Sequence, residues 1–176
     1  IEKVYDTIKD DKEFTIKGYT ITIKSGEEGA EPTYIYVIDK TVFEQAVENV
    51  VETFIGSTRY EQFKNGTQPE IVDTGYIIEK MYFKDEISIK ESYISVDERI
   101  YTNVTDLTKY LLFGNNNDYK EYVVAQGDTV AKIAEASRLN VSELLIANEE
   151  LKTEDTLLAI GQKLNIMIKC IDRESG

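Results

Sequence analysis

The alternation of apolar and polar residues predicts strands and one long helix in the first part of the chain. Residues 13–24 alternate around Gly18, which predicts a strand, a glycine turn and a second strand. A further β-prone run lies at 34–38. Between Asp39, a helix-capping residue, and Gly56, apolar residues recur three and four positions apart, so we expect a helix of about 16 residues there.

The pattern changes after this helix. Residues 57–69 are polar and predict a connection that ends in a proline. Three strand candidates follow, at 71–79, 81–90 and 91–101. A short helix is expected from Asn103 or Thr105 to Gly114. Together these elements predict an α+β domain, an antiparallel sheet with the long helix covering one face.

Residues 119–168 predict a smaller unit of strand, helix, helix and strand. The short run 122–124 is β-prone, and a Gly-Asp turn follows it. Asp128 or Thr129 is expected to cap the first helix, because a short oxygen side chain accepts from the free N–H groups of the first turn. Apolar residues at 130, 133 and 134 then share one helix face.

The second helix of this unit has its own boundary signals. Ser142 is the expected cap, with Val141 and Ile146 placed as a hydrophobic staple around it. Asn140 also adjoins this helix start and suits a capping role. Asn148 suits a left-handed residue at the end of the helix. An alternating run from Leu164 predicts the last strand.

These residues resemble a LysM domain. The matching positions are Tyr122, Val124, Gly127 to Thr129, Ile133, Ala134, Val141, Ser142, Leu144, Asn148 and Gly161 to Ile166. The resemblance implies a small βααβ module that binds N-acetylglucosamine polymers such as peptidoglycan and chitin. Ala131 departs from the family pattern, which often has an aromatic residue there. Ile160 and Met167 stand where proline is common.

The resemblance also implies a glycan site between two loops. The first loop holds Gly127, Asp128, Thr129 and Val130, and the second holds Leu157, Leu158, Ala159 and Ile160. In the family, backbone groups of these loops hold the acetamido groups, and small apolar side chains contact their methyls. Structural roles are the alternative for three residues, namely turn conformation for Gly127, capping for Asp128 and helix termination for Asn148.

A second resemblance covers the layout of the whole chain. The stretch from Tyr101 to Gly114, running into LysM, is similar to the non-catalytic forepart of bacterial cell-wall peptidases that continue through a G5-type module to an M23 metallopeptidase. That would place the chemistry beyond Gly176, and we expect the chain to be part of a longer protein. The expected domains are 1–114, a linker at 115–118, LysM at 119–168, and at 169–176 the start of a linker or next domain.

Composition excludes several classes of function. The net charge of −13, from 20 basic and 33 acidic residues, argues against a nucleic-acid partner, which needs clusters of Lys and Arg. The chain has no histidine, which excludes Ser-His-Asp and Cys-His catalysis and histidine-based zinc sites. The single cysteine excludes an intrachain disulfide. We expect no cofactor, no metal and no membrane insertion in this segment, since no apolar run approaches the length of a membrane span.

The sequence therefore predicts a non-catalytic cell-wall-binding fragment of a bacterial envelope protein, extracellular or wall-associated, whose first domain serves as a spacer, an assembly or a regulatory element. The alternative is an assembly or docking protein of a spore coat or phage tail. A third possibility is a carboxylate glycosidase in residues 1–118, although pairs such as Glu149-Glu150 fall in predicted loops. Ten of the twelve tyrosines precede residue 119, where they suit either sugar stacking or the edge of a sheet core.

Overall fold

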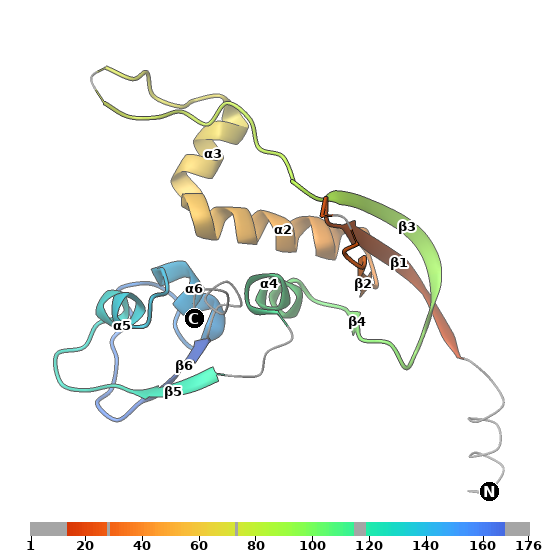
Figure 1. The fold of residues 1–176 in the computed structure, drawn as a ribbon. Helices are drawn as coiled ribbons and strands as arrows, with labels where there is room; N and C mark the ends of the chain where they lie inside the picture. Colours follow the sequence, from red (N-terminus) through yellow and green to blue (C-terminus); the bar gives the residue numbers. More distant parts are fainter. Residues whose placement is uncertain (1–13, 28, 73, 115–118, 168–176) are drawn as a thin grey trace, which may run out of the picture. The chain divides into compact units, whose positions relative to one another are not determined.

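The computed structural model describes residues 14–27, 29–72, 74–114 and 119–167. These residues form a mixed α+β structure with a four-stranded sheet and a separate two-stranded sheet (Figure 1). The α+β class expected from the sequence is therefore confirmed. Among the described residues, no helix is both long and apolar enough to cross a membrane.

The chain divides into two compact units. Unit 1 contains Ile1–Gln45 and Pro69–Val104, and unit 2 contains Ala46–Gln68 and Thr105–Gly176. This grouping differs from the domains expected at 1–114 and 119–168, and the expected linker, 115–118, lies outside the described residues. The expected bounds stay a prediction.

The sheet of unit 1 has the strand order β3-β1-β2-β4. Its strands are β1 (Thr15–Lys24), β2 (Thr33–Val37), β3 (Glu86–Ser95) and β4 (Ile100–Tyr101). β1 pairs antiparallel with both β2 and β3, whereas β4 pairs parallel with β2. The expectation of a purely antiparallel sheet is wrong at this edge, because the chain reaches β4 through a long crossover rather than a hairpin.

Gly18 lies inside a strand and forms no turn. β1 runs through it without a break, with Gly18 opposite Ser92 of β3. A Cβ atom at Gly18 would lie 2.6 Å from the Val37 carbonyl oxygen and 2.9 Å from Ile94 Cδ1. The glycine is needed here for close approach of a neighbouring segment, which is the other common reason for glycine in a strand.

The long helix is confirmed as α2 (Lys40–Ile55). Asp39 Oδ1 accepts hydrogen bonds of 2.8 Å from the backbone N–H and the hydroxyl of Thr41. Gly56 follows the helix with a φ of 84°, a conformation that glycine adopts without strain. The predicted polar connection after it is wrong, because residues 57–65 form helix α3 (Ser57–Asn65). Only Tyr60 of α3 is buried, so its apolar pattern is too sparse to reveal a helix.

The three strand candidates of the first region are only partly confirmed. β3 and the short β4 come from the second and third candidates, but residues 69–85 form no strand among the described residues. The predicted short helix is confirmed as α4 (Val104–Phe113), followed by Gly114 with a φ of 72°.

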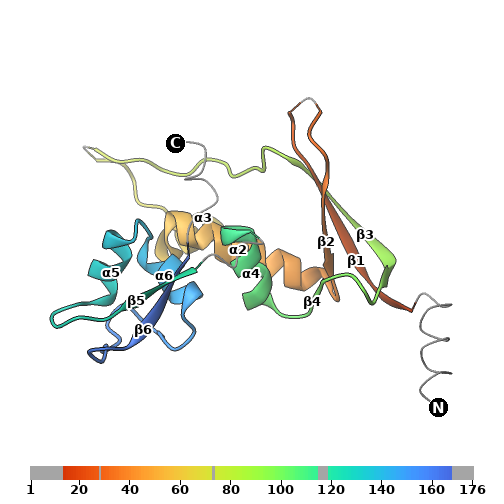
Figure 2. The same ribbon diagram turned by 60° about the horizontal axis from the view of Figure 1, so that its bottom comes forward.

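Unit 2 contains the expected βααβ arrangement. β5 (Tyr119–Val123) pairs antiparallel with β6 (Lys163–Met167), and α5 (Val130–Ala136) and α6 (Val141–Ala147) lie between them in the chain (Figure 2). Its core contains Phe113, Val124, Val130, Ile133, Ala134, Leu139, Leu144, Leu151 and Leu164. Phe113, which is 1% exposed, belongs to α4, so this core extends beyond the predicted module.

The helix caps of the module differ in part from prediction. Thr129, one of two candidates, caps α5 by accepting from the Lys132 N–H. For α6 the prediction of Ser142 is wrong. Asn140 is the cap, and it exchanges two hydrogen bonds of 2.8 Å with Glu143. The sequence signal was present, since a capping residue followed three positions later by glutamate is a capping box.

Candidate functional site

The two loops proposed to hold glycan lie at the same end of the β5-β6 ribbon. Val124 follows β5, and its N–H donates to the Gln162 carbonyl oxygen over 2.9 Å. The Gly161 N–H donates in return to the Val124 carbonyl oxygen over 2.8 Å. These two bonds continue the strand ladder by one step. The structure therefore brings the segments 125–130 and 157–160 together at one end.

Asp128 fixes the conformation of the first loop. Its Oδ2 accepts hydrogen bonds of 2.8 Å from the Ala125 N–H and from the Tyr122 hydroxyl. The bond from the Ala125 N–H, and then that from Tyr122, lower the pKa of Asp128 below its ordinary value. The same contact with Asp128 raises the pKa of the Tyr122 hydroxyl. Asp128 is thus a loop anchor, and the capping role considered for it belongs to Thr129.

Gly127 serves the turn through its backbone. Its φ is 87°, in the left-handed region where other residues are strained. Its carbonyl oxygen accepts from Lys132 Nζ over 2.9 Å. The conformational role considered for Gly127 is confirmed, and an additional contact with a ligand remains a prediction.

The second loop is closed by Gln162. Its Oε1 accepts from the Ala159 N–H over 3.0 Å, while its own N–H donates to the Ala159 carbonyl oxygen over 2.9 Å. Sequence reasoning matched Gln162 to the family pattern but did not place it in the site. A long amide side chain directly after a loop glycine is the signal that points to such a role.

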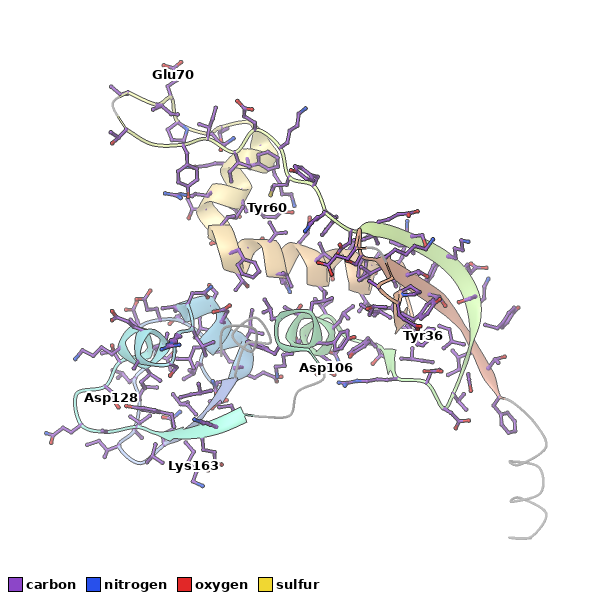
Figure 3. The ribbon with its side chains drawn as sticks, viewed as in Figure 1. Tyr36, Tyr60, Glu70, Asp106, Asp128 and Lys163 are labelled. Carbon is purple, nitrogen blue, oxygen red and sulfur yellow. The ribbon has the colours of Figure 1, made fainter. Side chains whose placement is uncertain are left out.

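The eight predicted site residues differ in exposure. Leu157 and Ile160 are 96% and 72% exposed, and Leu158 packs partly against the core. Gly127, Thr129 and Ala159 are exposed, while Asp128 is half-buried (Figure 3). Val130 is fully buried in the core, so its side chain supports the loop from beneath. The role of these residues as a glycan site stays a prediction.

Asn148 holds the second helix against the last strand. It is 1% exposed, and its side-chain amide donates to the carbonyl oxygens of Leu144 and Asn165, each over 2.9 Å. Its Oδ1 accepts from the Asn165 N–H over 2.6 Å. The structural role of Asn148 at the end of α6 is confirmed. The predicted left-handed conformation is wrong, since the φ of Asn148 is −133°. An asparagine that bonds both flanking segments needs no left-handed backbone.

The two loops differ from a metal or carboxylate site in the groups that they present. Within the described ranges, no three His, Cys, Asp or Glu side chains gather in a way that could hold a metal ion. Glu149, one of the paired carboxylates, is an exposed partner of Lys109 at 2.7 Å. The loops themselves present backbone amides and apolar side chains.

The comparisons with known proteins agree with this arrangement. Residues 122–166 match the family model of the LysM domain. LysM domains are non-catalytic domains that bind N-acetylglucosamine-containing glycans such as peptidoglycan and chitin, so the match implies glycan binding by this part of the chain. The chain has no match among curated proteins or among solved structures.

Proposed function

We propose that the chain is the non-catalytic, wall-binding part of a bacterial envelope protein, and that its LysM module holds glycan between segments 125–130 and 157–162. The observation that carries this proposal is the LysM match together with the hydrogen bonds that join Val124 to Gly161 and Gln162. These bonds fix the relative position of the two loops before any ligand arrives. The protein is then extracellular or attached to the cell wall.

The exposed apolar side chains of unit 2 support this location for the site. Among its described residues, unit 2 has four exposed large apolar residues, Phe54, Val123, Leu157 and Ile160, and the last three lie at the end of β5 or in the second loop. Exposed apolar residues that gather at one place mark binding surfaces more often than isolated ones do. Here they offer contact to the acetamido methyls of the glycan.

The backbone of the two loops supplies the polar contacts. Within the part of the chain that the structure describes, the N–H groups of Gly127 and Ile160 donate to no protein acceptor. Exposed amides of this kind suit a neutral polymer that carries amides and hydroxyls. A shallow site of this type gives weak affinity, roughly millimolar to micromolar or about −4 to −8 kcal/mol, and a protein with several modules gains avidity.

Titration of the chain with a chitin oligomer tests the site. We expect NMR chemical-shift changes confined to residues 127–130 and 157–160, with little dependence on salt because the contacts are uncharged. Ala159→Tyr should abolish these changes, because Ala159 is exposed in the second loop. Ala136→Tyr is the matched control at an exposed helix position and should bind normally. Changes elsewhere, or none at high oligomer concentration, would contradict the proposal.

The alternative function is assembly or docking, as in a spore coat or phage tail. The apolar surface of unit 1 favours it as a second activity, since fourteen of the eighteen large apolar residues that are exposed in the described parts of the chain lie in that unit. Sedimentation with purified peptidoglycan separates the two functions, because a docking module would stay in solution. Release of reducing ends from the same material would instead support a glycosidase in residues 1–118. A peptidase domain beyond Gly176 would fit the wall-binding role.

A further inference from the structure

Unit 1 has a sheet edge without a strand neighbour. β3 pairs with β1 along all ten of its residues, and among the described residues no strand lies on its other side. At the opposite edge of the sheet, β4 is only two residues long. A long uncovered strand edge is a template for another strand, and natural proteins usually cover or shorten such edges.

The segment that leads into β3 is extended and apolar. Figure 2 shows it running into the start of β3 without lying along the strand. Seven of its large side chains are between 38% and 92% exposed, namely Ile71, Val72, Tyr76, Ile77, Met81, Tyr82 and Phe83. The five of these within residues 76–84 expose on the order of 700 Å², given the usual size of such side chains. A standard protein interface buries about 800 Å² on each partner, so this part of the segment is close to the size of one.

The segment and the edge are complementary in sequence. On one face of β3, Tyr93, Glu91 and Ile89 alternate as apolar, acidic and apolar residues, and Tyr93 and Ile89 are 76% and 39% exposed. The preceding segment carries the matching set, in which Ile78, Lys80 and Tyr82 alternate as apolar, basic and apolar residues.

An antiparallel register that places Lys80 opposite Glu91 also brings the apolar residues of the segment opposite the apolar residues of β3. Ile78 then lies opposite Tyr93, and Tyr82 lies opposite Ile89. Opposite charges and apolar pairs that face one another across strands stabilise a sheet. Shifting the register by one residue would turn each set toward the other face of the sheet.

We propose that the chain forms a twofold dimer in which residues 76–84 of each copy add as a fifth strand to β3 of the other copy. Pairing within one chain would require a two-residue hairpin at Asp85-Glu86. Such hairpins need left-handed conformations at both loop positions, and Glu86 stands at the second position, where glycine is usual. Exchange between two copies needs no tight turn, and the reciprocal contact closes the assembly as a dimer.

The dimer places Glu91 between two lysines. In the single chain Glu91 already contacts Lys17 of β1 at 3.0 Å, with both side chains more than half exposed. Lys80 of the second copy would approach it from the open edge. The net charge of −13 on each copy opposes association, so the dimer should tighten as salt screens this repulsion. This salt dependence is the opposite of what a charge-driven contact would show.

Single-cysteine variants test the register and the partner together, in chains that carry Cys170→Ser. Chains with Lys80→Cys and chains with Glu91→Cys are mixed and oxidised. We expect a disulfide-linked dimer of the two variants, because opposed residues in a sheet lie within disulfide reach. Lys90→Cys in place of Glu91→Cys is the control, since residue 90 faces the other side of the sheet. Equal crosslinking by the control would overturn the proposal.

Three further measurements complete the test. In the double variant Lys80→Cys/Glu91→Cys, a disulfide formed within one chain would mean that the strand pairs in cis, and this would overturn the dimer. Sedimentation of the unmodified chain should show a dimer, and a monomer at every concentration would also overturn it. Lys80→Glu should weaken the dimer about tenfold, and adding Glu91→Lys should restore it. These substitutions are at exposed positions, so the far-UV circular dichroism should stay unchanged.

Discussion

The two units expose their apolar residues in different ways. In unit 2 the exposed large side chains are few, and three of the four lie where the proposed glycan loops meet. Among the described residues of unit 1 they are numerous, and nine of the fourteen lie in the segment before β3 or in β3 itself. Isolated exposed apolar residues are ordinary, whereas grouped ones mark a binding surface. The comparison indicates a small ligand surface in unit 2 and a larger protein surface in unit 1.

The largest effect is expected in the core of unit 2. Phe113→Ala should lower the free energy of unfolding of this unit by about 3–5 kcal/mol, because it leaves a cavity among the apolar side chains of the module. Urea unfolding followed by a probe in the module measures the loss. Phe54→Ala is the control, because Phe54 is 60% exposed and its loss should cost less than about 0.5 kcal/mol. Similar values for both variants would show that α4 is not part of this core.

The same contact sharpens the prediction that the module folds alone. From the sequence, a fragment of residues 119–169 is expected to unfold cooperatively. A fragment that starts at Asn103 retains Phe113 and should therefore be more stable by a comparable amount. Thermal unfolding of the two fragments checks this. Equal melting temperatures would mean that the first helix and strand of the module close the core without α4.

In unit 1 a smaller effect is expected at Gly18. Gly18→Ala should destabilise the sheet by about 1–3 kcal/mol, because the new Cβ meets a backbone carbonyl that has little freedom to move. Gly26→Ala is the matched control, since a Cβ there has no heavy atom within 4 Å. Hydrogen exchange of β1 and β2 measures the loss locally. A variant as well protected as the natural chain would mean that Val37 can shift at little cost.

Local signals predicted the βααβ module and the helices α2 and α4, but not α3. The βααβ order, α2 and α4 all follow from periodic apolar positions bounded by capping residues and glycines. The predicted loops are neighbours because β5 and β6, which were both expected as strands, pair with each other. Ser142 was preferred over Asn140 as the cap of α6, although Glu143, three residues after Asn140, completes a capping box with Asn140.

Long-range contacts could not be predicted in the same way. The residues near Gly18 in the sequence do not indicate that the Val37 carbonyl oxygen lies close to Gly18 in the fold. The sequence pattern predicts that Phe113 lies at the end of a short helix. Only the tertiary structure shows that its side chain packs in the core of the module. Residues 71–83 have strand propensity, but a strand also needs a partner edge, and local sequence does not say which chain provides it.

The smallest effect concerns the loop anchor Asp128 in unit 2 and its dependence on pH. The pKa of Asp128 lies below its ordinary value of 3.8, because the carboxylate accepts from the Ala125 N–H and the Tyr122 hydroxyl. The ionised Asp128 carboxylate stabilises the loop fully above pH 3.8. This stabilisation is lost as the pH falls below 3.8 toward the lower pKa of the folded state. The pKa of Tyr122 is raised from 10.0, so its contribution is complete below that pH and is lost above it. Glycan affinity should therefore be constant near neutral pH and fall in strong acid.

Asp128→Asn should reproduce the acid effect at neutral pH by weakening the anchor. In unit 1, Asp39 also has a lowered pKa, because the Thr41 N–H and hydroxyl donate to it, yet it lies at the start of α2. Asp39→Asn is therefore the control that loses a similar carboxylate while leaving the glycan loops intact. Titration with a chitin oligomer at neutral pH should show weaker binding for Asp128→Asn alone. Equal affinities for the two variants would mean that the loop keeps its conformation without the charged anchor, and that the site depends only on the bonds between Val124, Gly161 and Gln162.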